Sequence, residues 1–122
     1  AQKLFLTETH LQNVGINLER NFIIAGTPDE YGCPEFPILF EKKKRPECPE
    51  SHYDKAEKDM IRVCSEFCDK NAHIGALMLE CTGMQPFARA VQRVVDLPVF
   101  SWGTLLDYAY SVVAHRDYYG HV

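Results

Sequence analysis

Short apolar runs alternate with stretches of helical periodicity along this chain. The runs at residues 3–6, 22–25, 75–79 and 96–100 are apolar, short and bounded by turn-forming residues, which predicts four buried strands. Residues 37–40 are a candidate for one short edge strand. Strands that alternate with helices predict an α/β domain with a mainly parallel sheet.

The longest predicted helix begins at Ser51 and ends near residues 71–73. Ser51 and Asp54 make a near capping box, in which Asp replaces the preferred Glu. One face of this helix carries apolar residues at helical spacing: Met60, Ile61, Cys64, Phe67 and Cys68. A later helix should turn five side chains inward: Phe87, Ala88, Val91, Val94 and Val95. Two more helices should follow: one after Thr7, whose hydroxyl can cap the first turn, and one after residues 101–104.

The chain is predicted to form a single domain, residues 1–122, with a loop-rich insertion at residues 26–50. Five of the seven prolines lie in this insertion, so little regular structure is expected there. It also contains the basic run 42–45, which we interpret as solvated surface.

Size and charge exclude several classes of protein. The formal net charge of −4 leaves no basic footprint for nucleic acid, and no apolar run approaches the ~20 residues of a membrane helix. No signal peptide is recognisable, so a cytoplasmic location is expected. The start at Ala1, without an initiator Met, suggests a processed chain or a fragment.

Five cysteines cannot all pair within one chain, and their positions do not resemble a secreted disulfide scaffold. Cys33, Cys48, Cys64 and Cys68 are conceivable zinc ligands, but their spacing matches no paired CxxC pattern. Cys64 and Cys68 also lie within an apolar stripe, which favours a core position. A Cys33–Cys48 disulfide is the other open alternative. We predict no metal and no cofactor.

The stretch from Gly75 to Pro86 concentrates the candidate chemistry. An apolar strand runs into Glu80, Cys81, Thr82 and Gly83, and a helix follows. This places Cys81 at the carboxyl end of a buried strand, against the first turn of a helix. Helix N-termini offer free N–H groups and a partial positive charge, which favour thiolates and bound carboxylates. The alternative is that Cys81 is a small buried apolar residue in a strand-to-helix turn.

Residues 79–84 with Pro86, followed by residues 97–100, resemble the second cysteine motif of the aspartate/glutamate/hydantoin racemase superfamily. Residues 4–11 and 14–16 resemble the strand, Thr-containing loop and turn that open the second half of that family. The resemblance spans most of the chain and is weakest at residues 26–50. It implies an α/β fold, a three-layer sandwich with a mainly parallel sheet, similar to one half of the racemase fold.

The resemblance also implies a cofactor-independent reaction at the carbon α to a carboxylate. In the family, one cysteine thiolate removes the α-proton and a second thiol returns a proton to the opposite face. By position, Cys81 matches one of these acid/base cysteines. The N–H groups of Thr82 and Gly83 would bind the substrate carboxylate, and Thr7, Thr9 and the Thr82 hydroxyl are further candidate substrate contacts. For Thr7 and Thr9 the alternative is ordinary helix capping.

Family members have about twice this length, and the first half, with its own cysteine motif, is absent here. We therefore expect the chain alone to be a weak or inactive racemase that needs a complementary half-domain or a homo-oligomer. The alternative is a non-catalytic domain of the same fold that binds a small carboxylate or serves in protein interaction. An unrelated flavodoxin-like role lacks support, because the sequence has no Gly-rich phosphate loop.

Overall fold

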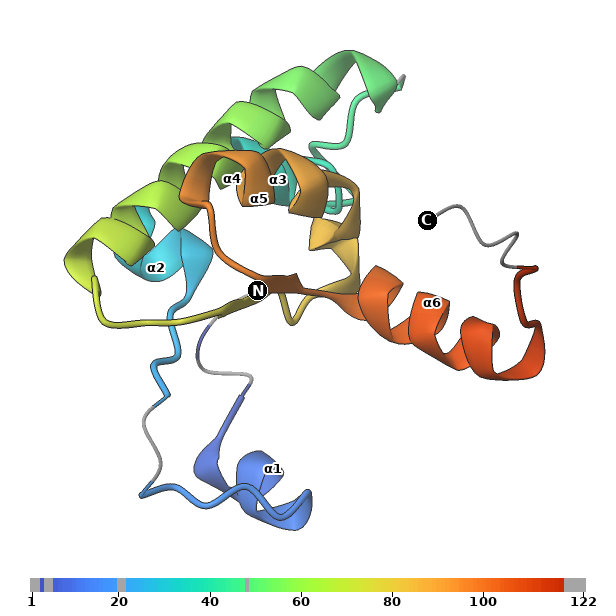
Figure 1. Cartoon of the computed structure of the whole chain (residues 1–122). Coiled ribbons are helices and arrows are strands. Elements are labelled where there is room, and N and C mark those ends of the chain that lie inside the picture. The colour runs from blue at the N-terminus through green and yellow to red at the C-terminus, as the bar shows by residue number, and fades with distance from the viewer. Residues whose placement is uncertain (1–2, 4–5, 20–21, 48, 118–122) are drawn as a thin grey trace.

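The computed structural model describes residues 3, 6–19, 22–47 and 49–117. Its elements follow in the order α1 (Glu8–Asn13), α2 (Thr27–Tyr31), α3 (Glu35–Ile38), α4 (Glu50–Lys70), β1 (Leu77–Met78), the 3-10 helix η2 (Thr82–Phe87), α5 (Ala88–Val95), β2 (Val99–Phe100) and α6 (Trp102–Val113) (Figure 1). The fold is thus mixed α/β, as predicted. None of the helices in these described ranges has the length and apolar character that crossing a membrane requires.

The two strands form a parallel pair. Leu77 lies opposite Val99, and Met78 lies opposite Phe100. The Leu77 N–H donates to the Pro98 carbonyl at 2.9 Å, and the Leu79 N–H donates to the Phe100 carbonyl at 2.8 Å. The intervening η2 and α5 form the crossover that a parallel connection needs. The predicted strands at residues 75–79 and 96–100 are therefore present, in shortened form.

Three other strand predictions differ from the structure. Residues 22–25 are not helical, but they pair with no strand in the described chain. The prediction of an edge strand at residues 37–40 is wrong, because these residues form the end of α3 and a turn. Pro37 is tolerated in the first turn of α3, where its missing N–H has no helical acceptor. Of residues 3–6, Lys3 and Leu6 lie in a turn, while residues 4 and 5 lie outside the described chain.

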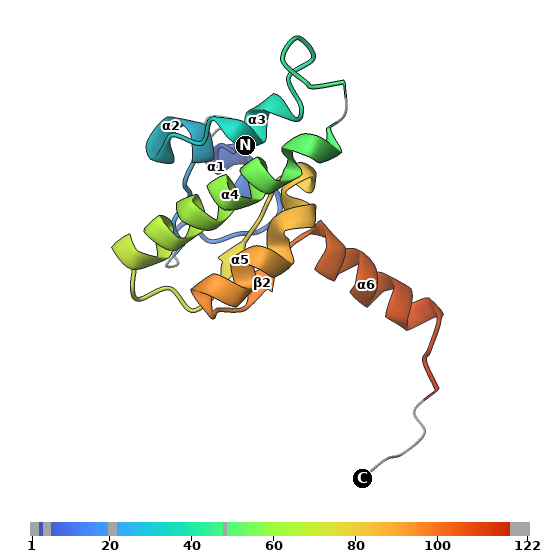
Figure 2. The same ribbon diagram turned by 90° about the horizontal axis from the view of Figure 1, so that it is seen from above.

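Helices α4 and α5 lie side by side and cover one face of the strand pair (Figures 1 and 2). Leu77, Leu79 and Val99 are buried beneath these helices. Met78 and Phe100 point to the other face and are 72% and 51% exposed. Parallel sheets are normally covered on both faces, so this pair has only one of its two expected helical layers within the described residues.

The long helix α4 supplies five of the fourteen described residues of the main core, more than any other element. Its buried face comprises Ala56, Asp59, Met60, Val63, Cys64 and Phe67. It begins at Glu50, with Pro49 in the N-cap position, one residue before the predicted start. In α5, Val91 is fully buried as predicted, but Val94 is 53% exposed, so its predicted inward orientation is wrong. Phe87, Val91 and Val95 follow each other at intervals of four, and Val94 lies to the side of that row.

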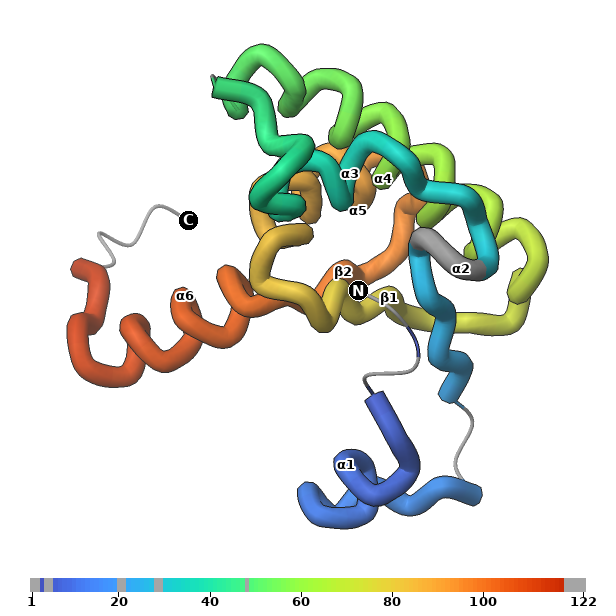
Figure 3. The backbone as a smooth tube through the Cα atoms, turned by 180° about the vertical axis from the view of Figure 1, so that it is seen from behind, coloured from blue at the N-terminus to red at the C-terminus, as the bar shows by residue number. Residues whose placement is uncertain are grey.

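Residues 26–50 are less peripheral than the sequence suggests. They contain α2 and α3, and three of their side chains belong to the main core: Cys33, Phe36 and Leu39. In contrast, α1 and α6 project from the body at two different places (Figure 3). Neither of these two helices has a buried residue.

Candidate functional site

Cys81 lies at the junction predicted for it, between the end of β1 and the start of η2. Its backbone is extended (φ −75°, ψ 130°), it occupies the N-cap position, and its carbonyl accepts the Met84 N–H at 2.9 Å. The side chain is half-buried. The helix that follows differs from the expected one, because its first six residues form a 3-10 helix before α5 begins.

The N–H groups of Thr82 and Gly83 precede the first hydrogen bond of η2, so neither has an acceptor within that helix. Thr82 is exposed and Gly83 is half-buried. The ring of Phe40 lies against Gly83, since a Cβ built on this glycine would come 2.5 Å from Phe40 Cζ. Any other residue at position 83 would force that exposed ring to move.

A cavity of about 790 Å³ lies between residues near the N-terminus, α4 and β1. Its wall is mostly apolar, and Leu6, Ile24, Val63 and Leu79 are representative members. Cys81 forms part of this wall. The volume is within the ~300–1,000 Å³ of small-molecule sites.

The cavity wall also contains a few groups that can be charged. Lys3 and His73 are the basic ones in the described lining, and Glu80 is acidic. Lys3 Nζ is already paired with Glu30 at 3.0 Å. Most of the wall therefore favours a ligand with an apolar body over a ligand that carries two carboxylates.

Thr7 and Thr9 lie on or beside α1, outside the cavity wall. Thr7 is the N-cap of α1: its N–H donates to His10 Nδ1 at 3.1 Å, and its hydroxyl lies 2.7 Å from the same nitrogen. Thr9 is exposed on the helix. Among the five candidate site residues, Cys81 alone lines the cavity, so the structure does not place Thr7 or Thr9 in the cavity wall with it. For Thr7, the capping alternative describes what the side chain does.

The other described cysteines, Cys33, Cys64 and Cys68, are free thiols in less reactive surroundings. Burial, followed by the hydrogen bond and charge of Asp59, raises the pKa of Cys33 to about 12. Burial also raises the pKa of Cys64 to about 12, with smaller contributions from Cys68 and Cys33. The pKa of Cys68 is raised by burial and then by Asp69. All three thiols are therefore neutral near pH 7.

These findings bear on the disulfide and metal alternatives. Cys33 is a free thiol, which does not support the alternative of a Cys33–Cys48 disulfide; Cys48 itself lies outside the described residues. No group of three or more His, Cys, Asp or Glu side chains in the described ranges could hold a metal ion. The conceivable zinc site made of four cysteines includes Cys48 and therefore lies partly outside the described residues.

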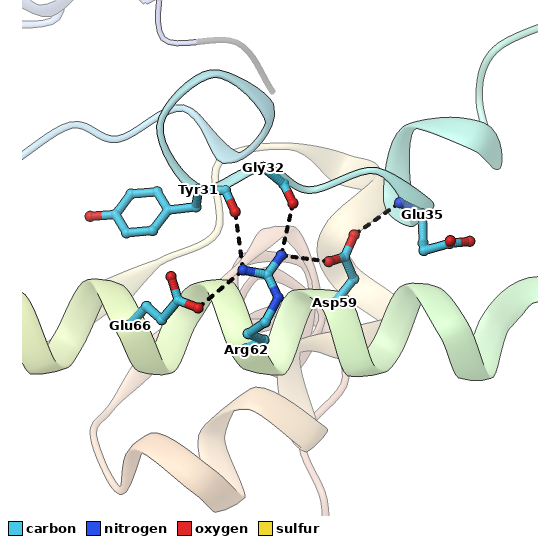
Figure 4. A network of polar contacts seen from close by, with 6 residues as sticks. All are labelled: Tyr31, Gly32, Glu35, Asp59, Arg62 and Glu66. Carbon is cyan, nitrogen blue, oxygen red and sulfur yellow. Dashed lines mark hydrogen bonds and ion pairs between the residues drawn. The ribbon is translucent and has the colours of Figure 1, made fainter.

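A polar network that sequence reasoning missed fastens the turn between α2 and α3 onto α4 (Figure 4). The Arg62 guanidinium donates to the carbonyls of Tyr31 and Gly32 at 3.1 and 2.8 Å. It also pairs with Asp59 at 2.8 Å and with Glu66 at 3.1 Å. The available signal was the spacing of these three charged residues, at i, i+3 and i+7 on one helix face.

Asp59 is the buried member of this network. Burial by itself would raise its pKa, but hydrogen bonds from Arg62, Cys33 and the Glu35 N–H outweigh burial and hold the pKa below 3.8. The Glu35 N–H to Asp59 Oδ2 distance is 2.9 Å. The folded chain thus binds the carboxylate form, and this stabilisation is fully present above pH 3.8 and lost as the pH falls through the lower folded value.

We expect Asp59→Asn to lower the free energy of unfolding by about 2 kcal/mol at pH 7, because charge-assisted hydrogen bonds of a buried group are lost. The difference from the parent should shrink as the pH falls below 3.8 toward the lower pKa of the folded carboxylate, because the parent side chain then becomes protonated as well. Urea unfolding at pH 7, 5 and 3 measures it. Asp54→Asn, at an exposed position of the same helix, is the control and should change little. A constant difference at all three pH values would contradict the assignment.

In comparisons with protein-family models, curated proteins and solved structures, none matched this chain. The resemblance to the racemase superfamily therefore depends on the residue motifs alone, and function has to be argued from the site.

Proposed function

We propose that Cys81 is an acid/base group that exchanges a proton with the carbon α to a carboxylate, without a cofactor, in a domain of the racemase type. The observation that carries this proposal is the position of Cys81: half-buried, in the wall of the 790 Å³ cavity, where β1 ends and η2 begins. In α/β folds ligands bind at the carboxyl ends of parallel strands. The raised pKa values of Cys33, Cys64 and Cys68 leave very little of their thiolate forms at pH 7, so these three thiols are poorly suited to remove a proton there.

The reaction step involves one proton and one carbon–hydrogen bond. The Cys81 thiolate takes the α-proton, and the electron pair of the broken bond is delocalised into the carboxylate. The N–H groups of Thr82 and Gly83, which have no acceptor within η2, would be the backbone donors for that charge. The thiol then returns a proton to the same face of the carbon. The apolar cavity wall favours a small carboxylate with an apolar substituent.

Inversion of the carbon needs a second acid on the opposite face. We place that group on a complementary half-domain or on another copy of the chain. The same partner would cover the open face at Met78 and Phe100 and complete a three-layer sandwich. The free thiols at Cys33, Cys64, Cys68 and Cys81 suit a reducing compartment such as the cytoplasm.

The test is the rate at which iodoacetamide alkylates each cysteine of the native chain, followed by peptide mass spectrometry. We expect Cys81 to react at least tenfold faster at pH 7 than Cys33, Cys64 or Cys68, since their thiolates are scarce at that pH. Phenylacetate should slow the labelling of Cys81 more than succinate does. If Cys81 is labelled only after denaturation, it is a core residue and the proposal fails.

A second candidate function is carboxylate binding or protein interaction without catalysis. The exposed apolar surface of α6 favours it. Phenylacetate affinity that is unchanged in Cys81→Ser, together with no proton exchange in the parent chain, would identify a binding domain.

A further inference from the structure

Helix α6 is amphipathic, yet within the described part of the chain its apolar face is exposed along most of its length. Its apolar residues recur at the a, d and e positions of a heptad: Trp102, Leu105, Leu106, Ala109, Val112 and Val113. At 100° per residue these six lie within an arc of about 120°, the width of a stripe that normally faces a core. The polar residues Thr104, Asp107 and Ser111 lie on the opposite side. We call the six residues the α6 stripe.

None of the α6 stripe is buried. Leu105, Leu106, Val112 and Val113 each expose more than half of their surface. With Tyr108 and Tyr110 at its two edges, the exposed apolar area is on the order of 700 Å². That exceeds the few hundred Å² that monomers usually expose as one patch, and it approaches the ~800 Å² that each partner contributes to a standard interface.

The start of α6 is fixed to the loop that carries Cys81. The Trp102 indole N–H donates to the Glu80 carbonyl at 2.9 Å, and the Gly103 N–H donates to Gln85 Oε1 at 2.8 Å. A Cβ on Gly103 would overlap the Gln85 amide, so the two segments are in close contact. The first turn of α6 is therefore fixed to the body by these two hydrogen bonds. The rest of the helix projects away from the body, as Figures 1 and 2 show.

We infer that the α6 stripe is a homodimer interface, in which the α6 helices of two copies of this chain pack against each other. This inference goes beyond the proposed chemistry and does not depend on it. Asp107 is the single charged residue of α6 and lies on its polar side, so the stripe offers no charge for a complementary partner to recognise. An uncharged apolar stripe is complementary to itself, as a two-fold symmetric contact requires.

The geometry of a helix pair also fits. Ala109 lies at the centre of the stripe and near the middle of a helix about 18 Å long. A small side chain there lets two helices approach to the usual ~8–10 Å. The amino-terminal end of this contact, at Trp102 and Gly103, then lies beside Glu80 and η2 in each copy.

The test is sedimentation velocity of the full chain from about 1 to 100 µM, together with the emission of Trp102, the one tryptophan of the chain. We expect a dimer, and a blue shift of Trp102 emission as concentration rises. Leu106→Glu and Val112→Glu should each raise the dimer dissociation constant at least tenfold, because each places a charge in the apolar contact. Ser111→Glu adds the same charge on the polar side and should leave the dimer intact.

Far-ultraviolet circular dichroism checks that each variant is folded. A parent chain that stays monomeric at 100 µM with unchanged Trp102 emission overturns the inference, and the stripe is then a site for a different partner. Equal weakening by Ser111→Glu and by Leu106→Glu overturns it as well. Cys81 alkylation in the same samples is a separate readout, so failure of the dimer and failure of the proposed chemistry are distinguishable.

Discussion

Replacement of Cys81 by serine is expected to lower α-proton exchange at least 100-fold, because a hydroxyl cannot serve as the base near neutral pH and general-base catalysis typically contributes ~10²–10⁴-fold. The measurement is deuterium incorporation at Cα of L-2-phenylglycine in D₂O, followed by NMR. Phenylglycine suits the apolar wall of the cavity. Serine is only slightly smaller than cysteine, and the side chain at position 81 is half-buried. The free energy of unfolding should therefore change by less than about 1 kcal/mol.

The configuration at Cα after exchange distinguishes one acid/base group from two. With Cys81 as the one acid/base group, the chain should incorporate deuterium while the configuration at Cα is retained, since the proton returns to the same face. Full racemisation by the 122-residue chain would contradict the idea that a second half is needed. Cys68→Ser is the matched control: this thiol has a raised pKa, lies outside the cavity wall and should be replaceable without effect. Unchanged exchange in Cys81→Ser would falsify the role of Cys81.

Phe87→Ala should cost about 3–5 kcal/mol of unfolding free energy, the range for deleting a fully buried aromatic side chain. Phe87 is 1% exposed, and its ring lies 6.1 Å from that of Phe36 and 5.5 Å from that of Tyr53. It therefore joins α3, α4 and the end of η2 in one cluster. Against a typical total of ~5–15 kcal/mol, this loss would leave little stability. The measurement is the urea midpoint and slope from circular dichroism.

Phe40→Ala is the size-matched control for Phe87→Ala. Phe40 is 56% exposed, although its ring contacts Phe36 at 5.1 Å between centroids. We expect it to cost about 1 kcal/mol or less, because most of its surface is already in water. Similar losses for the two variants would mean that Phe87 does not hold the core together.

Local patterns were sufficient to predict α4, the crossover and the strand-to-helix position of Cys81. The apolar stripe on α4 and the apolar-to-turn transition at residues 79–83 depend on neighbours in sequence, which is why they were readable. The strands predicted at residues 22–25 and 37–40 are absent, the second because its residues form the end of α3 and a turn. An apolar run specifies a strand only if a partner strand lies beside it, and neither segment has one in the described chain.

For the candidate site as well, the sequence predicted local features but not contacts between distant segments. The motif located Cys81, but whether Thr7 lies near it depends on where α1 packs, and the structure keeps Thr7 in its own helix cap. The network of Asp59 and Arg62 was equally out of reach, because Arg62 binds carbonyls thirty and thirty-one positions earlier in the chain.

By itself the amino-acid sequence determined the α/β class, the long core helix and the position of Cys81, the cysteine proposed as an acid/base group. These follow from periodicity and turn chemistry, which act over a few residues. Only the tertiary structure decided that Cys33 is buried, which apolar helix face is exposed and which residues share a wall with Cys81. Those properties arise from contacts between distant segments, and burial, pKa and exposure depend on such contacts.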